Sequence, residues 1–313
     1  MADVKCIATR ESYGNALKEL AENGADDLVV LDADLSAATK TAIFKKAFPQ
    51  RHINCGIAES NMMCVAAGLS TMGFVPFASS FAMFAAGRAF EQIRNSIGYP
   101  HLNVKIGATH AGISVGEDGA SHQCCEDFAL MRSIPGMVVI CPADDVEARQ
   151  AVKAAYAYDG PVYLRFGRLA VPVFHSDDYK FEIGKGELVK EGSDVTIIAN
   201  GLMVAEAIEA GKQLEACGIN AEIINIATIK PLDKELVVSS AKKTGKVITV
   251  EEHNIVGGLG EAVCAALSEE FPVPVKRIGI NDEFGHSGPA KDLLRQFGLC
   301  ADNITQVTKD FLK

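Results

Sequence analysis

The sequence predicts an α/β protein with two parallel-sheet domains, and two observations carry the prediction. Short, continuous apolar runs such as 27–31 alternate with longer segments of helical periodicity such as 11–23, as expected when buried parallel strands alternate with helices. This alternation stops midway along the chain and then restarts. We therefore expect a first domain over 1–172, a linker over 173–192 and a second domain over 193–313, each with helices on both faces of its sheet.

In the first domain, helices are expected where apolar residues recur at helical spacing, namely over 11–23, 60–72, 86–97 and 144–158. Strands are expected over 27–31, 103–108, 137–140 and 162–165. Gly24 follows the first of these helices, and Asp144 is an acidic cap for the last. Their alternation along the chain predicts parallel strands joined by helices.

The linker is predicted where the periodicity fails, around a charged turn at 175–178 and two closely spaced glycines, Gly184 and Gly186. In the second domain, strands are expected over 194–199, 221–226, 246–250 and 275–280. Helices are expected over 202–217, 233–243 and 259–270, with helical segments to the end. This alternation predicts a second, smaller parallel α/β domain.

Composition excludes several classes of protein. The 313 residues are 48% hydrophobic, enough for two cores, and no apolar run approaches a membrane span or a signal peptide. Nine cysteines without CxxC spacing indicate reduced thiols, so we expect a soluble, cytoplasmic protein. The net charge of -10, with Lys and Arg unclustered, argues against a nucleic-acid partner. The net charge does not exclude small anionic substrates, which a few cations in one cleft could bind.

The densest polar stretch is the loop 109–123, which directly follows a predicted strand. It therefore lies at the carboxyl edge of a parallel sheet, where α/β domains place ligand sites. Its histidines His110 and His122, together with Asp118, could bind a hydroxylated substrate and move protons on it. A glycine-rich loop with incidental histidines is the alternative.

Glu59 follows the run 56–58 and opens a predicted apolar helix. A glutamate there is favoured by the helix dipole, and it could also share a proton with a heterocyclic nitrogen. Local pattern does not decide between these roles. Phe81 and Phe84, followed by Arg88, are either core residues or a stacking platform for a flat ring.

Three further features admit functional interpretations. The two loop histidines and the neighbouring Cys124 and Cys125 are zinc-ligand types, although adjacent cysteines rarely share one tetrahedral ion. Arg165 and Arg168 close a predicted strand and could clamp a phosphate monoester or form a solvated pair. The glycines of 257–260 resemble a nucleotide-binding turn, but neither common nucleotide motif is present, which favours a packing role.

Together these stretches resemble the pyrimidine-binding and C-terminal domains of the transketolase family over nearly the whole chain. The segments that carry the resemblance are 8–10 (ATR), 32–36 (DADLS), 56–59 (GIAE), Phe81 with Phe84, 109–110 (TH), 116–123 (GEDGASHQ), 132–135 (RSIP), 142–144 (PAD) and 250–253 (VEEH). The resemblance implies a thiamine-diphosphate pyrimidine-binding fold followed by a transketolase C-terminal fold.

The resemblance also implies roles for single residues. Glu59 matches the glutamate that hydrogen-bonds a ring nitrogen of the cofactor's aminopyrimidine and promotes its imino tautomer. The residues expected to bind the cofactor are Glu59, Phe84, Phe81, Asp34 and Arg88. Those expected to bind substrate are Asp118, His110, His122, Arg10 and Arg168, with His110 and Arg168 towards the phosphate end. Glu59, His110 and His122 are the expected catalytic side chains.

Full-length members of the family begin with a further domain, in which a Gly-Asp-Gly motif and an asparagine hold the diphosphate through a divalent metal. This sequence has no such motif. The resemblance therefore implies an N-terminal partner subunit that carries Mg2+ or Ca2+, no metal ligand on this chain, and a heterotetramer containing a pair of these chains. Ala38 and Gly87 depart from the family pattern and leave the acceptor sugar open.

The implied reaction is transfer of a two-carbon ketol unit from a ketose phosphate to an aldose phosphate, as in the pentose phosphate pathway. A beta subunit of a 2-oxoacid dehydrogenase, or part of a deoxyxylulose-phosphate synthase, is an alternative within the same fold. The Asp118 loop and His110 favour transketolase. A non-catalytic scaffold subunit is the alternative from another class, and the joint presence of Glu59, Asp118, His110 and His122 argues against it.

Overall fold

The structure is a computed structural model that describes residues 5–313. The strands of the first half are β1 (Cys6–Ala8), β2 (Leu28–Asp32), β3 (His52–Asn54), β4 (Val75–Phe81), β5 (Lys105–Thr109), β6 (Val138–Ile140), β7 (Val162–Arg165) and β8 (Ala170–Pro172). Those that follow are β9 (Glu187–Lys190), β10 (Val195–Ala199), β11 (Ala221–Asn225), β12 (Thr228–Lys230), β13 (Val247–Asn254) and β14 (Val275–Ile280).

The α-helices alternate with these strands. They are α1 (Thr9–Glu22), α2 (Ser36–Thr39), α3 (Ala42–Ala47), α4 (Glu59–Thr71), α5 (Phe90–Gln92), α6 (Asp127–Arg132), α7 (Asp145–Ala157), α8 (Met203–Glu215), α9 (Lys234–Thr244), α10 (Leu259–Glu270), α11 (Ala290–Gln296) and α12 (Ala301–Leu312). Short 3-10 helices are η1 (Pro49–Arg51) and η4 (Ile113–Asp118), and π-helices are η2 (Met83–Arg88) and η3 (Ile93–Gly98).

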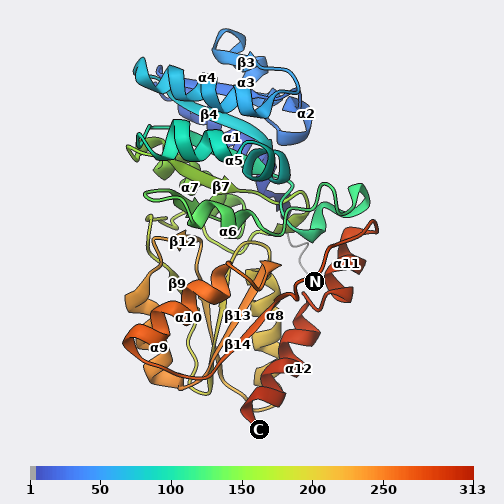
Figure 1. Ribbon diagram of the computed structural model, residues 1–313. Helices are drawn as coiled ribbons and strands as arrows, with labels where there is room; N and C mark the ends of the chain where they lie inside the picture. The colour runs from blue at the N-terminus through green and yellow to red at the C-terminus, as the bar shows by residue number, and fades with distance from the viewer. Residues whose placement is uncertain (1–4) are drawn as a thin grey trace.

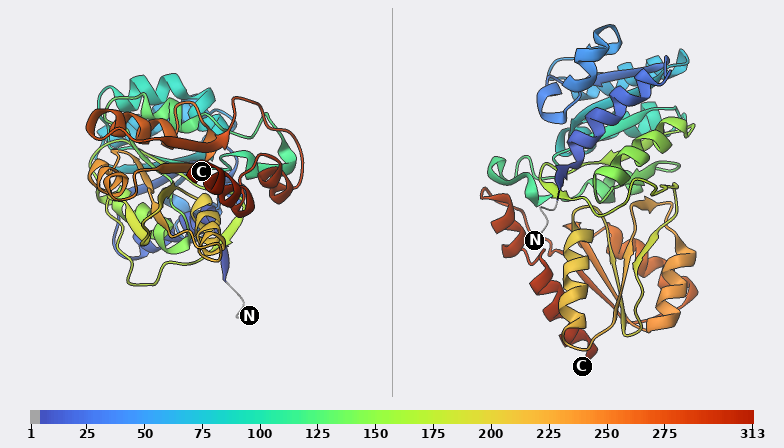
Figure 2. Two further views of the ribbon diagram at one scale, coloured as in Figure 1. Left: turned by 90° about the horizontal axis from the view of Figure 1, so that it is seen from below. Right: turned by 180° about the vertical axis from the view of Figure 1, so that it is seen from behind.

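Two α/β domains stack end to end, each built around one sheet (Figures 1 and 2). The first sheet has seven strands in the order β12-β6-β7-β5-β4-β2-β3, and the second has five in the order β14-β13-β10-β11-β9. A two-stranded antiparallel sheet pairs β1 with β8. Within the large sheets, all pairings are parallel except β12 with β6 and β9 with β11. The predicted α/β class is confirmed.

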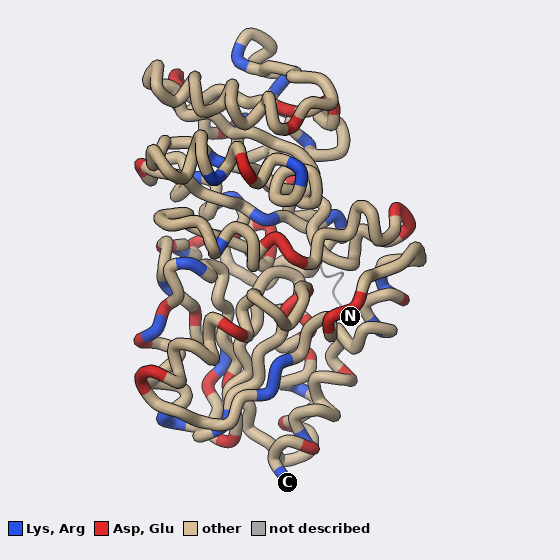
Figure 3. Tube along the Cα trace, in the orientation of Figure 1, with Lys and Arg blue, Asp and Glu red and all other residues tan. Residues whose placement is uncertain are grey.

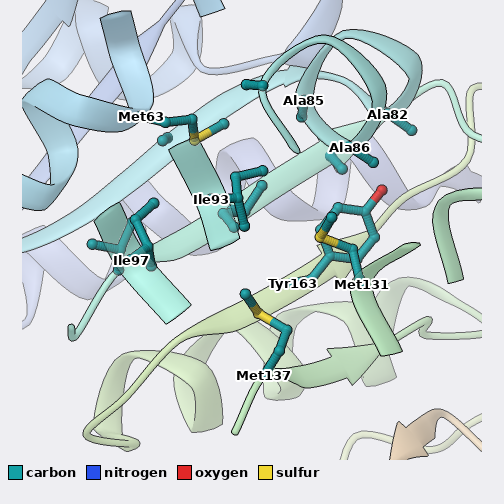
Figure 4. Close-up of a cluster of buried hydrophobic side chains, with 14 of the residues drawn as sticks. Met63, Ala82, Ala85, Ala86, Ile93, Ile97, Met131, Met137 and Tyr163 are labelled. Carbon is teal, nitrogen blue, oxygen red and sulfur yellow. The ribbon is translucent and has the colours of Figure 1, made fainter. Parts of the chain in front are cut away.

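Helices cover both faces of each sheet because successive strand residues point to opposite sides. In β2, Leu28 and Val30 pack with α1, α3 and α7, whereas Val29 and Leu31 pack with α4 and α6. Figure 4 shows part of the second of these clusters, in which alanines of the η2 region lie near Met131 and Tyr163. The second sheet is likewise enclosed between α8 with α12 and α9 with α10.

Two sequence expectations about local structure were wrong. The expected helix over 86–97 is broken into η2, α5 and η3, because over so few residues apolar spacing cannot separate α-helical turns from the wider π turns. Residues 187–190, expected in the linker, form β9 and pair with β11. Only half-buried and flanked by charges, this edge strand lacks the apolar run that marked the others.

The two domains also share a sheet, which the sequence pattern did not predict. Strand β12 lies after β11 in the chain, yet it pairs with β6 at the edge of the first sheet. Acidic and basic residues are interspersed over both domains rather than gathered in one basic surface (Figure 3). Over the residues that the structure describes, no helix is both long and apolar enough to span a membrane.

Candidate functional site

The predicted site residues come together at the carboxyl edge of the seven-stranded sheet. Asp34 follows β2, Glu59 follows β3, and Phe81 ends β4. His110 follows β5, and Arg168 follows β7. Because parallel strands end at a common edge, five segments distant in sequence meet there.

Glu59 is a buried carboxylate paired with one arginine. Its side chain is 2% exposed, and both carboxylate oxygens accept hydrogen bonds from Nη1 of Arg88, at 3.1 and 3.0 Å. Glu59 is the first residue of α4, whereas the N-cap position is Ala58. The carboxylate is therefore aimed at η2 across the strand ends, and the simple capping interpretation does not account for its contacts.

Aromatic rings form a cluster beside this carboxylate. Phe81 and Phe84 stack with their centroids 5.8 Å apart, and the guanidinium of Arg88 lies 4.7 Å from the Phe84 centroid. His110 stacks on Phe81 at 3.8 Å, and His122 meets Phe84 edge-on at 5.2 Å. Phe81 is buried and Phe84 half-buried, so these contacts are compatible with both interpretations of the phenylalanines, core packing and a stacking platform.

His110 is held by polar partners on both ring nitrogens. Its Nε2 lies 3.2 Å from Nη1 of Arg10, and its Nδ1 lies 2.9 Å from the Thr109 hydroxyl. Burial, then the charges of Arg10 and Arg168, lowers the pKa of His110 to about 3, so the imidazole is neutral at pH 7. Since arginine can only donate, Nε2 accepts and Nδ1 carries the proton. In the unliganded chain His110 is therefore an acceptor held in one tautomer.

The loop after β5 exposes Asp118 and Glu117, while Arg168 faces it from the end of β7. Nη1 of Arg168 donates to the Glu117 carboxylate at 2.8 Å and also to the carbonyl of Val115. The Arg168 side chain is 37% exposed, which leaves the guanidinium accessible to an anion. The His122 Nδ1 lies 2.9 Å from the Ser121 hydroxyl.

Asn54 is a site residue that sequence reasoning missed. Its amide nitrogen donates to Oδ1 of Asp34 at 3.0 Å, and its Oδ1 accepts from the backbone amides of Asp34 and Gly56 at 3.1 and 2.9 Å. It thus joins the turn after β2 to the turn that leads into Glu59. Its place at the end of β3 was the available signal, but three strand residues give little periodicity to detect.

Arg165 does not serve as a phosphate clamp. It is buried, with Nε 2.8 Å from the Asp127 carboxylate, and its Nη2 donates to the backbone carbonyl of Glu252 at 2.8 Å. Both interpretations from sequence, a clamp and a solvated pair, were therefore wrong for this arginine. Its ion pair with Asp127 instead stabilises the region where the first domain contacts β13.

The glycine turn at 257–260 is occupied by a carboxylate from the chain itself. Glu251 accepts from the amides of Leu259 and Gly260 at 2.6 and 2.8 Å, at the N-terminus of α10. This leaves no place for a nucleotide phosphate on those amides and agrees with the packing interpretation. Across residues 5–313, no group of three or more His, Cys, Asp or Glu side chains is arranged to hold a metal ion.

A cavity of about 690 Å3 lies away from these residues, between the segment that includes β8, the helix α8 and the region of α11 and α12. Its walls include Phe174, Leu202 and Leu294. None of the site residues predicted from the sequence lines it. Size alone therefore does not mark the chemical site, and the strand ends remain the better candidate because the polar and aromatic groups converge there.

The chain matches two family descriptions, "Transketolase, pyrimidine binding domain" over residues 5–173 and "Transketolase, C-terminal domain" over residues 184–304. A Methanocaldococcus jannaschii protein named as a transketolase C-terminal section is 50% identical over 307 residues, covering 97% of this chain and 96% of that protein. The 6-deoxy-6-sulfo-D-fructose transketolase subunit SqwH of a Clostridium species is 43% identical over 301 residues, covering 96% and 93%.

Solved structures agree. A split-gene transketolase in the form of an inactive beta4 tetramer superposes with a TM-score of 0.91 at 56% identity, with 98% of each chain covered. The chain spans about half the length of the mouse, rat and human transketolases that it also matches. These findings confirm the predicted resemblance. The chain therefore belongs to the transketolase family, whose members depend on thiamine diphosphate, and it is a transketolase-type subunit that corresponds to the C-terminal section.

Proposed function

We propose that this chain supplies the pyrimidine-binding half of a thiamine-diphosphate site and that it is active only with an N-terminal-section subunit. Together the two chains transfer a two-carbon unit from a ketose phosphate to an aldose phosphate. The observation that carries the proposal is the buried Glu59 carboxylate beside the Phe81 and Phe84 rings. A flat heterocycle with a basic ring nitrogen needs both an aromatic surface and a carboxylate at its edge.

The residues fit the cofactor in chemical type. Phe84 and Phe81 offer a ring surface, Glu59 offers a carboxylate, and Arg88 joins the two because it contacts both Phe84 and Glu59. Asp34 lies on the neighbouring turn, held by Asn54. When bound, the cofactor would supply the nucleophile and the electron sink for breaking a carbon–carbon bond. Glu59 would hold or release a proton at its Oε atoms, and the rings would exclude water from that carboxylate.

The substrate end is assigned to the residues around the β5 loop, which are Asp118, His110, His122, Arg10 and Arg168. Arg10 and Arg168 provide positive charge near His110, which adds to the effect of burial in lowering the pKa of that imidazole. A bound phosphate would offset these charges and raise the pKa of His110 from its value in the free chain. His122 and the exposed Asp118 would then contact hydroxyl groups of the sugar.

The proposal places the diphosphate and its Mg2+ or Ca2+ on the partner subunit. Its support is the span of the match, since this chain covers about half of the full-length transketolases. Two copies of each chain give a heterotetramer with two complete sites, and we propose a cytoplasmic location and a role in the pentose phosphate pathway. Because the relative SqwH is named for a sulfonated fructose, the proposal names the reaction and not a particular pair of sugars.

Reconstitution tests the proposal directly. We expect the purified chain alone to bind thiamine diphosphate weakly and to be inactive. Mixed with an N-terminal-section transketolase subunit, Mg2+ and the cofactor, it should bind the cofactor tightly and transfer two carbons between phosphosugars. The absence of transfer across a panel of ketose donors, with the two-chain complex demonstrably formed, would contradict the proposal. Consumption of pyruvate or another 2-oxoacid instead would favour the dehydrogenase or synthase alternative.

A further inference from the structure

The loop that carries Asp118 and His122 is closed at its base. The amide of Gly112 donates to the carbonyl of Cys124 at 2.8 Å, so the two ends of the loop meet. Between them, η4 and the residues that follow form a long excursion from the first domain. Figure 1 shows this segment extending to the side of the molecule beside α11 of the second domain. Within its own domain the outer part of the loop is held by Arg168, which donates to the Val115 carbonyl and the Glu117 carboxylate, and the second domain adds further contacts.

Glu252 of the second domain reaches into this loop. Its side chain comes from β13, is 3% exposed, and accepts the amide of Ser114 through Oε1 at 2.6 Å. Gly112 adopts a φ of +77°, and a Cβ atom there would lie 2.3 Å from Cδ of Glu252. The glycine thus allows the backbone to approach the carboxylate closely. A carboxylate buried this far is costly unless its oxygens are hydrogen-bonded, so the loop amide and Glu252 stabilise each other.

The segment before α11 supports the loop from the other side. The side-chain amide of Gln123 donates to the carbonyls of Ile113, Gly116 and His286, at 3.2, 3.3 and 3.0 Å. A Cβ atom on Gly119 would lie 2.5 Å from the Ser287 hydroxyl oxygen, so the two backbones are in close contact. Among the described residues, the second domain therefore contacts the loop through the Glu252 carboxylate and through the segment before α11.

We infer that Glu252 is a positioning residue, through which the second domain orders the substrate loop for donor binding. The expected kinetic effect rests on the proposed function, whereas the ordering of the loop by Glu252 is independent of it. If the loop is ordered in only a fraction of molecules, the apparent affinity for a ligand of the loop falls by that fraction. Cofactor binding, assigned to Glu59 and Phe84, should not change. Loss of Glu252 should therefore raise the KM for the donor more than it lowers kcat.

The adjacent Glu251 provides a matched control. It is also buried in β13, but its carboxylate caps α10 and does not contact the loop. Glu252→Met and Glu251→Met make the same change one residue apart. The first leaves the Ser114 amide without its acceptor, and the second leaves the amides of Leu259 and Gly260 without theirs. Glu252→Gln keeps the length and an acceptor oxygen for the Ser114 amide. Glu252→Gln should therefore retain most of the loop order and donor affinity that Glu252→Met loses.

The experiment measures two things. Amide hydrogen exchange over residues 113–119 is followed in the isolated chain, and donor KM, kcat and cofactor affinity are measured in the reconstituted complex. For Glu252→Met we expect faster exchange and a donor KM raised about 10- to 100-fold, the scale of one charged hydrogen bond, with kcat within about threefold. Glu252→Gln should remain near wild type in both. Glu251→Met should leave loop exchange and donor KM unchanged.

Two results would overturn the inference. One is unchanged loop exchange and donor KM in Glu252→Met; the other is an equal change in Glu251→Met, which would indicate general loosening of the second domain. If Glu252→Met does not fold, Ser114→Pro removes the donor instead of the acceptor and should give the same loop and KM effects. If the wild-type complex transfers no two-carbon unit, the proposed function fails, and loop exchange in the three glutamate variants still decides the role of Glu252.

Discussion

Replacing Glu59 by glutamine separates the chemical role of this side chain from its structural role. The ion pair that it forms with Arg88 joins a 2% exposed carboxylate to a 52% exposed arginine. Solvent screening of the arginine limits the pair to about 1 kcal/mol of folding stability. For a chain of this size that corresponds to a fall in Tm of less than about 4 °C. General acid–base catalysis typically contributes about 10²- to 10⁴-fold in rate, or about 3 to 5 kcal/mol of barrier.

We therefore expect Glu59→Gln to lower kcat by at least about 100-fold while the complex and its melting temperature are nearly preserved. The assay is two-carbon transfer by the reconstituted complex, with thermal unfolding measured on the same samples. Arg88→Gln is the control, because it breaks the same ion pair and leaves the carboxylate in place; its loss of kcat should be smaller, about tenfold. Turnover within threefold of wild type in Glu59→Gln, or a larger loss in Arg88→Gln, would refute the assignment.

Three further predictions concern stability. Burial lowers the pKa of His175, but hydrogen bonds to Asp144 and Glu187 raise it to about 10. Protonated His175 should therefore stabilise the folded chain fully below pH 6.5, and this contribution should be lost as the pH rises through 10. In urea unfolding, the free energies of unfolding of wild type and His175→Gln, plotted against pH, should converge at high pH. Asp127→Ala leaves Arg165 buried without its charge partner and should lower the free energy of unfolding by about 3–5 kcal/mol. A loss under about 1 kcal/mol would contradict a stabilising role for this ion pair. Gly107→Ala would place a Cβ atom 2.1 Å from the Tyr13 hydroxyl oxygen and should destabilise the chain by about 1–3 kcal/mol. At Gly68 in α4 a Cβ atom would meet no other atom within 4 Å, so Gly68→Ala should stabilise the isolated chain by about 0.5–1 kcal/mol. A change of the same sign in both variants would refute the packing argument.

Most central strands and long helices could be predicted because their burial produces a clear pattern. The run 27–31 and the helix 144–158 differ from β2 and α7 by a residue at either end. Edge strands could not be predicted in the same way, since β9 is only half-buried and four residues long and β12, although mostly buried, has only three residues. The predicted strand 246–250 stopped four residues short of the end of β13, because the polar residues Glu251 to His253 are buried there. Because these buried residues are polar, the sequence pattern did not indicate where the two domains meet.

The candidate site residues were proposed from the resemblance to the transketolase family, but their contacts could not be predicted. The resemblance to the transketolase family assigned Glu59, Phe81 and Phe84 to one proposed cofactor site, yet nothing in the local sequence indicated that Arg88 contacts both Glu59 and Phe84. Arg165 and Arg168 looked equivalent as two cations after one strand. Three-dimensional packing separates them, since Asp127 comes from α6 to bury the first while the second stays accessible beside Glu117. The order of residues along one segment therefore does not reveal a contact whose partner comes from a distant segment.

Backbone geometry explains why periodicity fails where the candidate site begins. Asp34 and His110, which follow β2 and β5, both have left-handed backbone, with φ values of 62° and 57°. Such conformations cost a non-glycine residue about 1–3 kcal/mol and need compensation from their surroundings. Asn54 provides it for Asp34 through two hydrogen bonds, and the stacking on Phe81 and the polar contacts on both ring nitrogens provide it for His110. Regular strands bring these residues to one edge, and irregular backbone then directs their side chains, so a sequence pattern can locate the site without specifying its geometry.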